Sequence, residues 1–199
     1  MIIGITGGIG SGKSTIAKQL REMGYAVYDT DSEAKRLITE DAIVHQQIEQ
    51  LFGSEAYTNG VYQTAWVAQR VFADKSLLAQ LNAIVHPAIK EDIIRWVQHI
   101  NAALPSYATS FQPTPCFVEC AILYQAGFNT LCDKVVAITA PEEVRIERVI
   151  TRDHSTIEKV RARMRAQDLE QNLQCADIVV NNDGTHPIPE LCEAILQQI

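Results

Sequence analysis

The sequence has no CxxC pair, no apolar stretch long enough to cross a membrane, no internal repeat and no low-complexity segment. Its five cysteines are an odd number, and most of them lie in apolar runs. This pattern argues against a disulfide framework, so we expect reduced thiols in the core of a cytoplasmic protein. The apolar run at the N-terminus is too short for a signal peptide. A metal site built from the scattered cysteines and histidines is a weak alternative.

Positive charge is also scarce. The chain holds 17 lysines and arginines against 24 acidic residues, a net charge of −7. This balance argues against a protein that coats nucleic acid or an anionic membrane. Seven of the 17 basic residues nevertheless fall within residues 145–165, which indicates a local anion site. Since 47% of the 199 residues are apolar, we expect one domain with a substantial core and a small insertion at most.

The first 31 residues show the pattern of a strand, a helix and a second strand. Residues 1–6 form a short β-branched run, residues 13–23 carry apolar side chains at helical spacing, and residues 25–28 read as another strand. A unit of these lengths predicts parallel strands. Further strands are predicted over residues 116–120, 134–139 and 177–181.

A helical block interrupts the strand pattern between residues 32 and 101. We expect Asp41 and Thr64 to cap helices and Asp74 to start another. Pro87 is expected in the first turn of a separate last helix. Three prolines between residues 102 and 115 predict a loop.

Two helices are predicted near the C-terminal strands. Pro141 starts one that runs to residue 152, and Ser155 with Glu158 makes a capping box for one that runs to about Leu173. The fold class is therefore α/β, with a five-stranded parallel sheet. We expect residues 1–31 and 111–199 to form the core and residues 32–110 to form a helical insertion.

Residues 7–14, GGIGSGKS, match the phosphate-binding pattern G-x-x-x-x-G-K-[ST]. Glycines let successive N–H groups curl around phosphate oxygens, and the N-terminus of the following helix adds partial positive charge. The lysine would reach the β- and γ-phosphates, and the serine hydroxyl would bind Mg²⁺. A glycine-rich turn that matches by chance is the alternative. The predicted ATP-binding residues are Gly8, Ile9, Gly10, Ser11, Gly12, Lys13, Ser14 and Thr15.

The motif predicts a nucleoside triphosphate site without naming the acceptor. The sequence lacks both the Asn-Lys-x-Asp and the Asp-x-x-Gly patterns of GTPases. A short chain with a helical insertion after the second strand therefore fits a small-molecule kinase best.

Two acids, Asp29 and Asp31, follow the second strand, at the edge of a parallel sheet where ligands bind. Asp31 could take the proton of an attacking hydroxyl, help to hold Mg²⁺ through water, or cap the next helix. His86, just before Pro87, is either a packed or capping histidine or a substrate contact.

Arginines recur at helical spacing near the C-terminal half. Arg148 and Arg152 share one helix face, and Arg161 and Arg165 repeat that spacing. A solvated charged face is one explanation. The other is a cationic flap that closes over the nucleotide and neutralises charge during phosphoryl transfer.

In combination these segments resemble the dephospho-coenzyme A kinase family over nearly the whole chain. The segments that carry the resemblance are GITGGIGSGKST, YDTDSEAK, RVFADKSLLAQLNAIVHPAI, VVAITAPEEVRIERVITRD, RMRAQ and ADIVVNNDG. The resemblance implies a P-loop kinase-type three-layer fold with a helical substrate domain and a basic helical lid at about residues 148–172. It also implies transfer of phosphate from ATP, with Mg²⁺, to the ribose 3′-hydroxyl of dephospho-coenzyme A.

The resemblance implies a role for each matching residue. Asp31 would be the general base, with Lys13 and Arg148 as further catalytic residues. Arg152 and Asn182 would bind ATP, and His86 and Arg163 would face the acceptor. The partners would be ATP and dephospho-coenzyme A, without nucleic acid or membrane, in a cytoplasmic monomer or weak homo-oligomer.

One stretch departs from the family pattern. The family commonly has Asp-x-Pro-Leu-Leu-Phe-Glu-x-Gly after the third strand, whereas residues 119–127 here read ECAILYQAG. Glu119 replaces the aspartate and would reach a Mg²⁺-bound water, while Gln125 replaces a glutamate. Two alternatives therefore stay open: a kinase for another nucleoside or nucleotide, and a nucleotide-binding regulator with little turnover.

Overall fold

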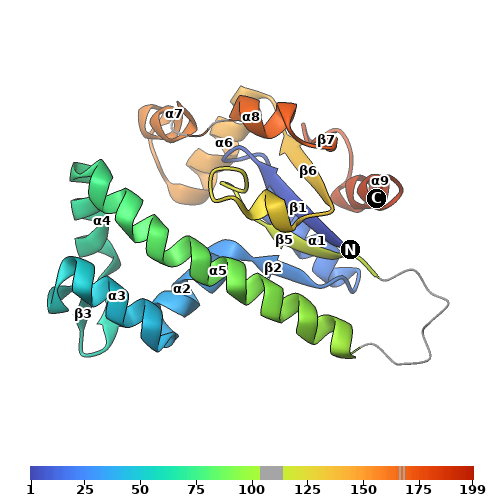
Figure 1. Ribbon diagram of the computed structural model, residues 1–199. Coiled ribbons are helices and arrows are strands. Elements are labelled where there is room, and N and C mark those ends of the chain that lie inside the picture. The colour runs from blue at the N-terminus through green and yellow to red at the C-terminus, as the bar shows by residue number, and fades with distance from the viewer. Residues whose placement is uncertain (104–113, 166, 168) are drawn as a thin grey trace. The chain divides into compact units, whose positions relative to one another are not determined.

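The computed structural model describes residues 1–103, 114–165, 167 and 169–199 (Figure 1). The chain divides into two compact units. The first, here called the sheet unit, comprises Met1–Asp29 and Phe111–Ile199, and the second, the helical unit, comprises Thr30–Ser110. Most of the loop predicted at residues 102–115 lies outside the described residues.

The sheet unit is built on a five-stranded parallel sheet in the order β2-β5-β1-β6-β7. This confirms the predicted α/β fold class. The strands are β1 (Ile2–Gly7), β2 (Val27–Asp29), β5 (Cys116–Glu119), β6 (Lys134–Thr139) and β7 (Ile178–Asn181). β1 lies at the centre, and its residues Ile3 and Ile5 are fully buried. The carboxyl ends of these strands meet at one edge, where loops carry the polar residues described below.

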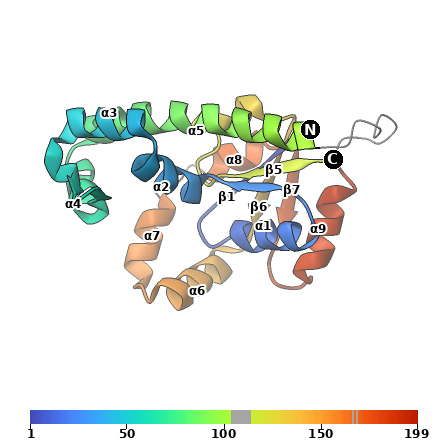
Figure 2. The same cartoon turned by 90° about the horizontal axis from the view of Figure 1, so that it is seen from below.

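Helices cover both faces of the sheet. Figure 2 shows α1 (Lys13–Glu22) and α9 (Ile188–Leu196) on one face, and α8 (Leu169–Gln174) on the other. Ile16 and Leu20 of α1 and Ile195 of α9 join the strands in one core cluster. The result is the predicted three-layer arrangement.

Two further helices of the sheet unit follow β6. α6 (Glu142–Asp153) and α7 (Ile157–Arg165) pack on each other through a small apolar cluster around Val149 and Val160. The capping prediction for α7 is off by one residue, because the Thr156 hydroxyl, not Ser155, accepts a bond from the Lys159 N–H at 3.5 Å. The helix predicted to reach Leu173 ends at Arg165, and α8 is separate. A short 3₁₀ turn, η2 (Phe128–Leu131), precedes β6.

The helical unit holds four α-helices in its described part. Its elements are α2 (Thr30–Glu40), α3 (Ala42–Phe52), η1 (Ser54–Ala56), β3 (Tyr57–Thr58), β4 (Val61–Tyr62), α4 (Thr64–Ala73) and α5 (Lys75–Ala103). Two predicted caps are confirmed. Asp41 Oδ1 accepts from the Ile43 and Val44 N–H groups, and Asp74 accepts from the first turn of α5. Thr64 is not a cap but the first residue of α4.

The prediction of a helix boundary at Pro87 is wrong. Pro87 lies inside the 29-residue helix α5. A proline inside a helix costs about 3 kcal/mol because it removes a hydrogen bond and crowds the preceding turn. Val85, Ile89 and Ile93 are buried at four-residue spacing on both sides of it. Their packing outweighs the local preference and keeps the helix continuous.

All five cysteines are free thiols. Cys116, Cys120 and Cys192 are buried, as expected, but Cys175 is exposed and does not belong to the core. Among the described residues, none of the helices combines the length and the apolar character that a membrane span requires.

Candidate functional site

The glycine-rich loop joins β1 to α1 at the carboxyl edge of the sheet. Gly10 and Gly12 have φ angles of +79° and +94°, in the left-handed region that glycine tolerates. A side chain at Gly12 would also collide with the Asn182 side chain. The loop therefore requires glycine at this position both for its backbone angles and for space.

The N-terminus of α1 is suited to an anion. Gly12 occupies the cap position without a side-chain hydrogen bond, and the first turn, Lys13-Ser14-Thr15, has no acidic residue. N–H groups in the first turn of a helix have no partner within the helix, point beyond its N-terminus and form the positive end of the helix dipole. This arrangement favours phosphate over any cationic ligand.

Lys13 is largely buried, with 8% of its surface exposed. Its ammonium group donates to the Gly8 carbonyl across the loop at 3.1 Å. The same carbonyl accepts from the Ser11 N–H at 3.1 Å. The lysine head group is therefore held over the concave side of the loop, where the pattern predicts the β- and γ-phosphates.

Oxygen groups gather beside the loop. The Ser14 hydroxyl donates to Glu119 Oε1 at 2.8 Å, and Glu119 is 8% exposed. Glu119 is in register with Asp29 on the neighbouring parallel strand, so both side chains project from the same face. A hydroxyl and two carboxylates are the ligand types that Mg²⁺ prefers, so these residues fit the metal that the phosphate-binding pattern implies.

Arg148 and Asn182 lie against the start of α1. Arg148 Nη1 donates to the Asn182 carbonyl at 2.9 Å, and Asn182 Nδ2 donates to the Ser11 carbonyl at 2.9 Å. Asn182 is 3% exposed and Arg148 is half-buried. Two residues far apart in the sequence thus meet beside the glycine loop: Arg148, predicted to be catalytic, and Asn182, predicted to bind ATP.

Arg152 and Arg163 lie elsewhere. Both are exposed, and both donate to the Asp153 carboxylate, at 2.7 Å and 2.8 Å. These two guanidinium groups hold the pKa of Asp153 well below its usual range. Arg161 forms a looser ion pair with Glu142 at 3.7 Å. Arg148 is therefore held beside the loop, whereas Arg152, Arg161 and Arg163 of the same basic segment are paired on the surface.

Sequence reasoning missed two residues that contact the loop. Arg145 of α6 is 6% exposed, and its Nε donates to the Ile9 carbonyl at 2.9 Å. Burial lowers the pKa of its guanidinium. Gln167 accepts from the Ile9 N–H at 2.6 Å. The helical spacing of Arg145 with Arg148 and the RMRAQ segment were signals that could have indicated both.

Two predicted site residues, Asp31 and His86, belong to the helical unit. Asp31 lies in the first turn of α2, two residues beyond the last residue of β2. Because α2 begins at Thr30, Asp31 is not its N-cap, and that alternative is wrong. His86 lies on α5, and burial lowers its pKa.

The helix that carries Asp31 is tied to α5 by charge. Arg36 of α2 donates to Asp92 of α5 at 2.7 Å and to Glu33 at 2.5 Å. Arg95 also pairs with Asp92, at 3.2 Å. Of these bonds, the one between Arg36 and Asp92 links α2 to α5 within the helical unit.

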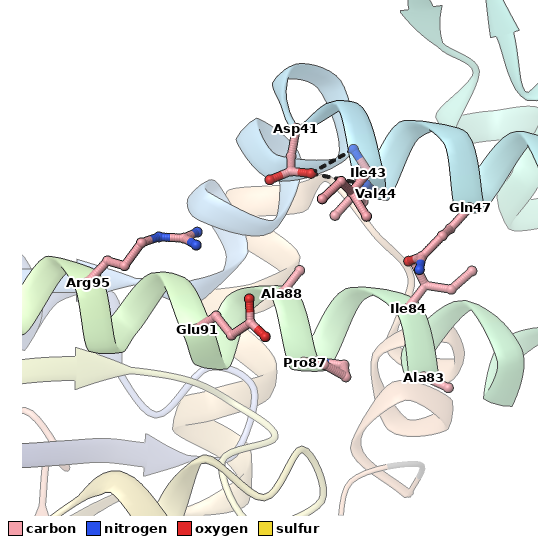
Figure 3. A pocket seen from close by; sticks show the side chains of 10 residues that line it. All are labelled: Asp41, Ile43, Val44, Gln47, Ala83, Ile84, Pro87, Ala88, Glu91 and Arg95. Carbon is pink, nitrogen blue, oxygen red and sulfur yellow. Dashed lines mark hydrogen bonds between the residues drawn. The ribbon is translucent and has the colours of Figure 1, made fainter.

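A cavity of about 240 Å³ opens between α3 and α5 in the same unit (Figure 3). Its polar members, Asp41, Gln47, Glu91 and Arg95, stand beside apolar groups such as Ile84 and Pro87. His86 is absent from the lining. The mixed lining can contact both the apolar and the hydrogen-bonding parts of a ligand.

Comparisons with known proteins place the chain in a family. A family model described as dephospho-CoA kinase matches residues 1–187. A dephospho-CoA kinase of Porphyromonas gingivalis is 42% identical over 186 residues, 92% of this chain and 87% of that protein.

Solved structures agree on the fold. TT1252 from Thermus thermophilus is 32% identical with a TM-score of 0.82, covering 100% of this chain and 97% of that one. Dephospho-CoA kinase from Campylobacter jejuni has the same fold with a TM-score of 0.70 at 23% identity, covering 99% and 96%. The chain therefore belongs to the dephospho-CoA kinase family.

Proposed function

We propose that this chain transfers the γ-phosphoryl group of ATP to the ribose 3′-hydroxyl of dephospho-coenzyme A, the last step of coenzyme A synthesis. Family membership supports this reaction, and a kinase for another nucleoside or a regulator without turnover is not favoured. The observation that carries the proposal is the glycine loop with Lys13 over it and the Ser14–Glu119 bond beside it.

The sheet unit would bind the donor. N–H groups of residues 8–15 and the Lys13 ammonium would hold the phosphates, with Asn182 and Arg152 as further ATP contacts. Ser14, with Glu119 acting through water, would hold Mg²⁺, and Asp29 would assist. Bound there, the metal would neutralise charge on the phosphate oxygens.

The helical unit would bind the acceptor. The 3′-oxygen attacks the γ-phosphorus, the bond from phosphorus to the β–γ bridging oxygen breaks, and the hydroxyl proton passes to the Asp31 carboxylate. Arg148 would stabilise the charge that spreads over the transferred group, because a planar guanidinium matches phosphate oxygens. His86 and Arg163 would contact the acceptor.

The decisive experiment is ADP release from the purified protein with ATP and Mg²⁺, with and without dephospho-coenzyme A. We expect release that depends on dephospho-coenzyme A and is far slower with AMP or uridine. Thermal shift gives a second measurement, since a ligand at 100 times its Kd adds about 2.7 kcal/mol to stability. Equal responses to all three acceptors would reject the proposed substrate, and ATP binding without acceptor-dependent release would favour the regulator.

The role of Asp31 has its own test. Asp31→Asn should lower kcat by about 10²-fold or more, the usual share of a general base, and leave ATP affinity nearly unchanged. Asp74→Asn is a matched control in the same unit, because asparagine can still cap α5. Near-normal turnover of Asp31→Asn would reject the general-base role.

A further inference from the structure

Ile9 is the one residue with an apolar side chain between Gly7 and Lys13. That side chain leaves the loop and packs against the apolar cluster of α6 and α7 formed by Ile146, Val149 and Val160. Both backbone groups of Ile9 are engaged as well, its N–H by Gln167 and its carbonyl by Arg145. The sequence pattern predicts that Ile9 binds ATP. In the structure its side chain, its N–H and its carbonyl are all in contact with other parts of the protein.

The two peptide planes that flank Ile9 matter because glycines lie on both sides of it. Gly8 and Gly10 impose little steric restraint on rotation of these planes, so hydrogen bonds must set their orientation. In a trans peptide the N–H and the C=O point in opposite directions. A hydrogen bond that fixes the direction of the N–H or the C=O of a peptide therefore also fixes the direction of the other group.

Arg145 sets the plane between Ile9 and Gly10. Its Nε holds the Ile9 carbonyl at 2.9 Å, so the Gly10 N–H points the opposite way, away from that guanidinium. A Cβ at Gly8 would lie 2.5 Å from Arg145 Nη2, so the guanidinium fills the space beneath the loop. With 6% of its surface exposed, Arg145 is a fixed part of the loop's support.

Gln167 sets the plane between Gly8 and Ile9. Its Oε1 holds the Ile9 N–H at 2.6 Å, so the Gly8 carbonyl points the other way. That carbonyl accepts hydrogen bonds from the Lys13 ammonium group and from the Ser11 N–H, each at 3.1 Å, so Gln167 holds the plane from the side opposite to these two donors. The position of the lysine head group thus depends on a side chain 154 positions farther along the chain.

We propose that Gln167 and Arg145 are positioning residues that set the two peptide planes flanking Ile9, and thereby aim the Gly10 N–H and the Lys13 ammonium group at the phosphates of ATP. The inference relies on the proposed function only for ATP as the ligand. Neither side chain touches the reacting atoms. Loss of either contact would let a plane rotate and would turn a carbonyl dipole toward the phosphates.

The test compares Gln167→Leu, which loses the acceptor oxygen, with Gln167→Glu, which keeps one. Gln197→Leu, at an exposed position, is the matched control. Removing a neutral hydrogen bond of ordinary strength predicts a rise in the Kd for a non-hydrolysable ATP analogue of about threefold to tenfold in Gln167→Leu. Gln167→Glu keeps the acceptor but adds a negative charge near the phosphates, so its Kd, measured at high salt to screen that charge, should rise less than that of Gln167→Leu. The control should keep the Kd of the unmodified protein.

Calorimetric titration with the analogue alone gives the Kd, so the result does not depend on the acceptor. Failure of dephospho-coenzyme A as a substrate would leave this measurement intact. The KM for ATP should rise with the Kd, while the KM for the acceptor and the Tm without ligand change little. Equal Kd values for the leucine and glutamate variants, or a fall in Tm that accounts for the loss, would overturn the proposal.

Discussion

Four arginines along α6 and α7 show how one residue type takes two different roles. Arg145 and Arg148, in the first two turns of α6, are bound to the glycine loop and to Asn182. Arg152 and Arg163, at the end of α6 and in α7, are exposed and share Asp153. The first pair is held against the glycine loop and its neighbour Asn182, whereas the second pair is held on the surface.

Helix geometry explains the difference. Arg145, Arg148 and Arg152 follow one another at spacings of three and four and so lie on the same face of α6. Each turn advances 5.4 Å along the axis, so the last of the three lies about 10 Å beyond the first. Only the first two are within reach of the loop, and the third meets Asp153 instead. Three predictions test this contrast.

The largest effect is expected at Arg148. Arg148→Ala should lower kcat by about 10²-fold to 10³-fold, the usual loss when one charge-stabilising donor is removed from a transition state. Steady-state kinetics at saturating ATP measures it. Arg21→Ala, on the exposed far end of α1, is the control and should keep normal turnover. Normal kcat together with lower stability in Arg148→Ala would assign this arginine to the scaffold.

A smaller effect, on stability, is expected at Arg145. Arg145→Met keeps most of the buried volume but leaves the Ile9 carbonyl unpaired, at a cost of about 1–3 kcal/mol. Release of a buried charge offsets part of that cost, because burial already lowers the pKa of this guanidinium. We expect a net loss of about 1–2 kcal/mol in the free energy of unfolding, measured by urea denaturation. An unchanged free energy of unfolding would show that the hydrogen bond from Arg145 to the Ile9 carbonyl does not stabilise the fold.

The smallest effect is expected at Asp153, because its ion pairs are exposed to solvent. Arg152 and Arg163 hold the pKa of Asp153 below its value in the unfolded chain, about 3.9. Its contribution is therefore present above about pH 4 and is lost as the pH falls further.

Asp153→Asn should lower the Tm slightly at pH 7, and the difference from the unmodified protein should shrink as the pH approaches 3. Thermal melts across that range measure it. High salt should reduce the difference at neutral pH, since surface ion pairs are screened. A difference that grows on acidification would contradict this account.

Patterns of short range predicted much of the fold. The alternation of β-branched runs and amphipathic segments indicated the parallel sheet, and the glycine-lysine-serine pattern indicated the phosphate loop. Asp41 and Asp74 were identifiable as caps because capping is decided within three or four residues. Pro87 was misjudged because packing of α5 over its whole length outweighs one unfavourable residue.

The site was predictable only in part, because several of its contacts join residues that lie far apart in the sequence. Lys13 and Ser14 belong to a contiguous motif, whereas Arg145 and Gln167 act on Ile9 from 136 and 158 residues away. The sequence marks 145–165 as basic but does not distinguish a buried arginine from an exposed one. The Ser14–Glu119 bond likewise depends on β5 lying beside β1.

By itself the sequence determined the phosphate loop and the family, because both rest on the order of residues within short segments, one for the loop and several along the chain for the family. Only the tertiary structure decided that Arg145 contacts the loop and Arg148 contacts Asn182. It also decided that Arg152 and Arg163 both form ion pairs with Asp153. The physical reason is that a side chain's role depends on the partners within hydrogen-bond reach. Those partners come from strands and helices that the fold, rather than the order of residues, brings together.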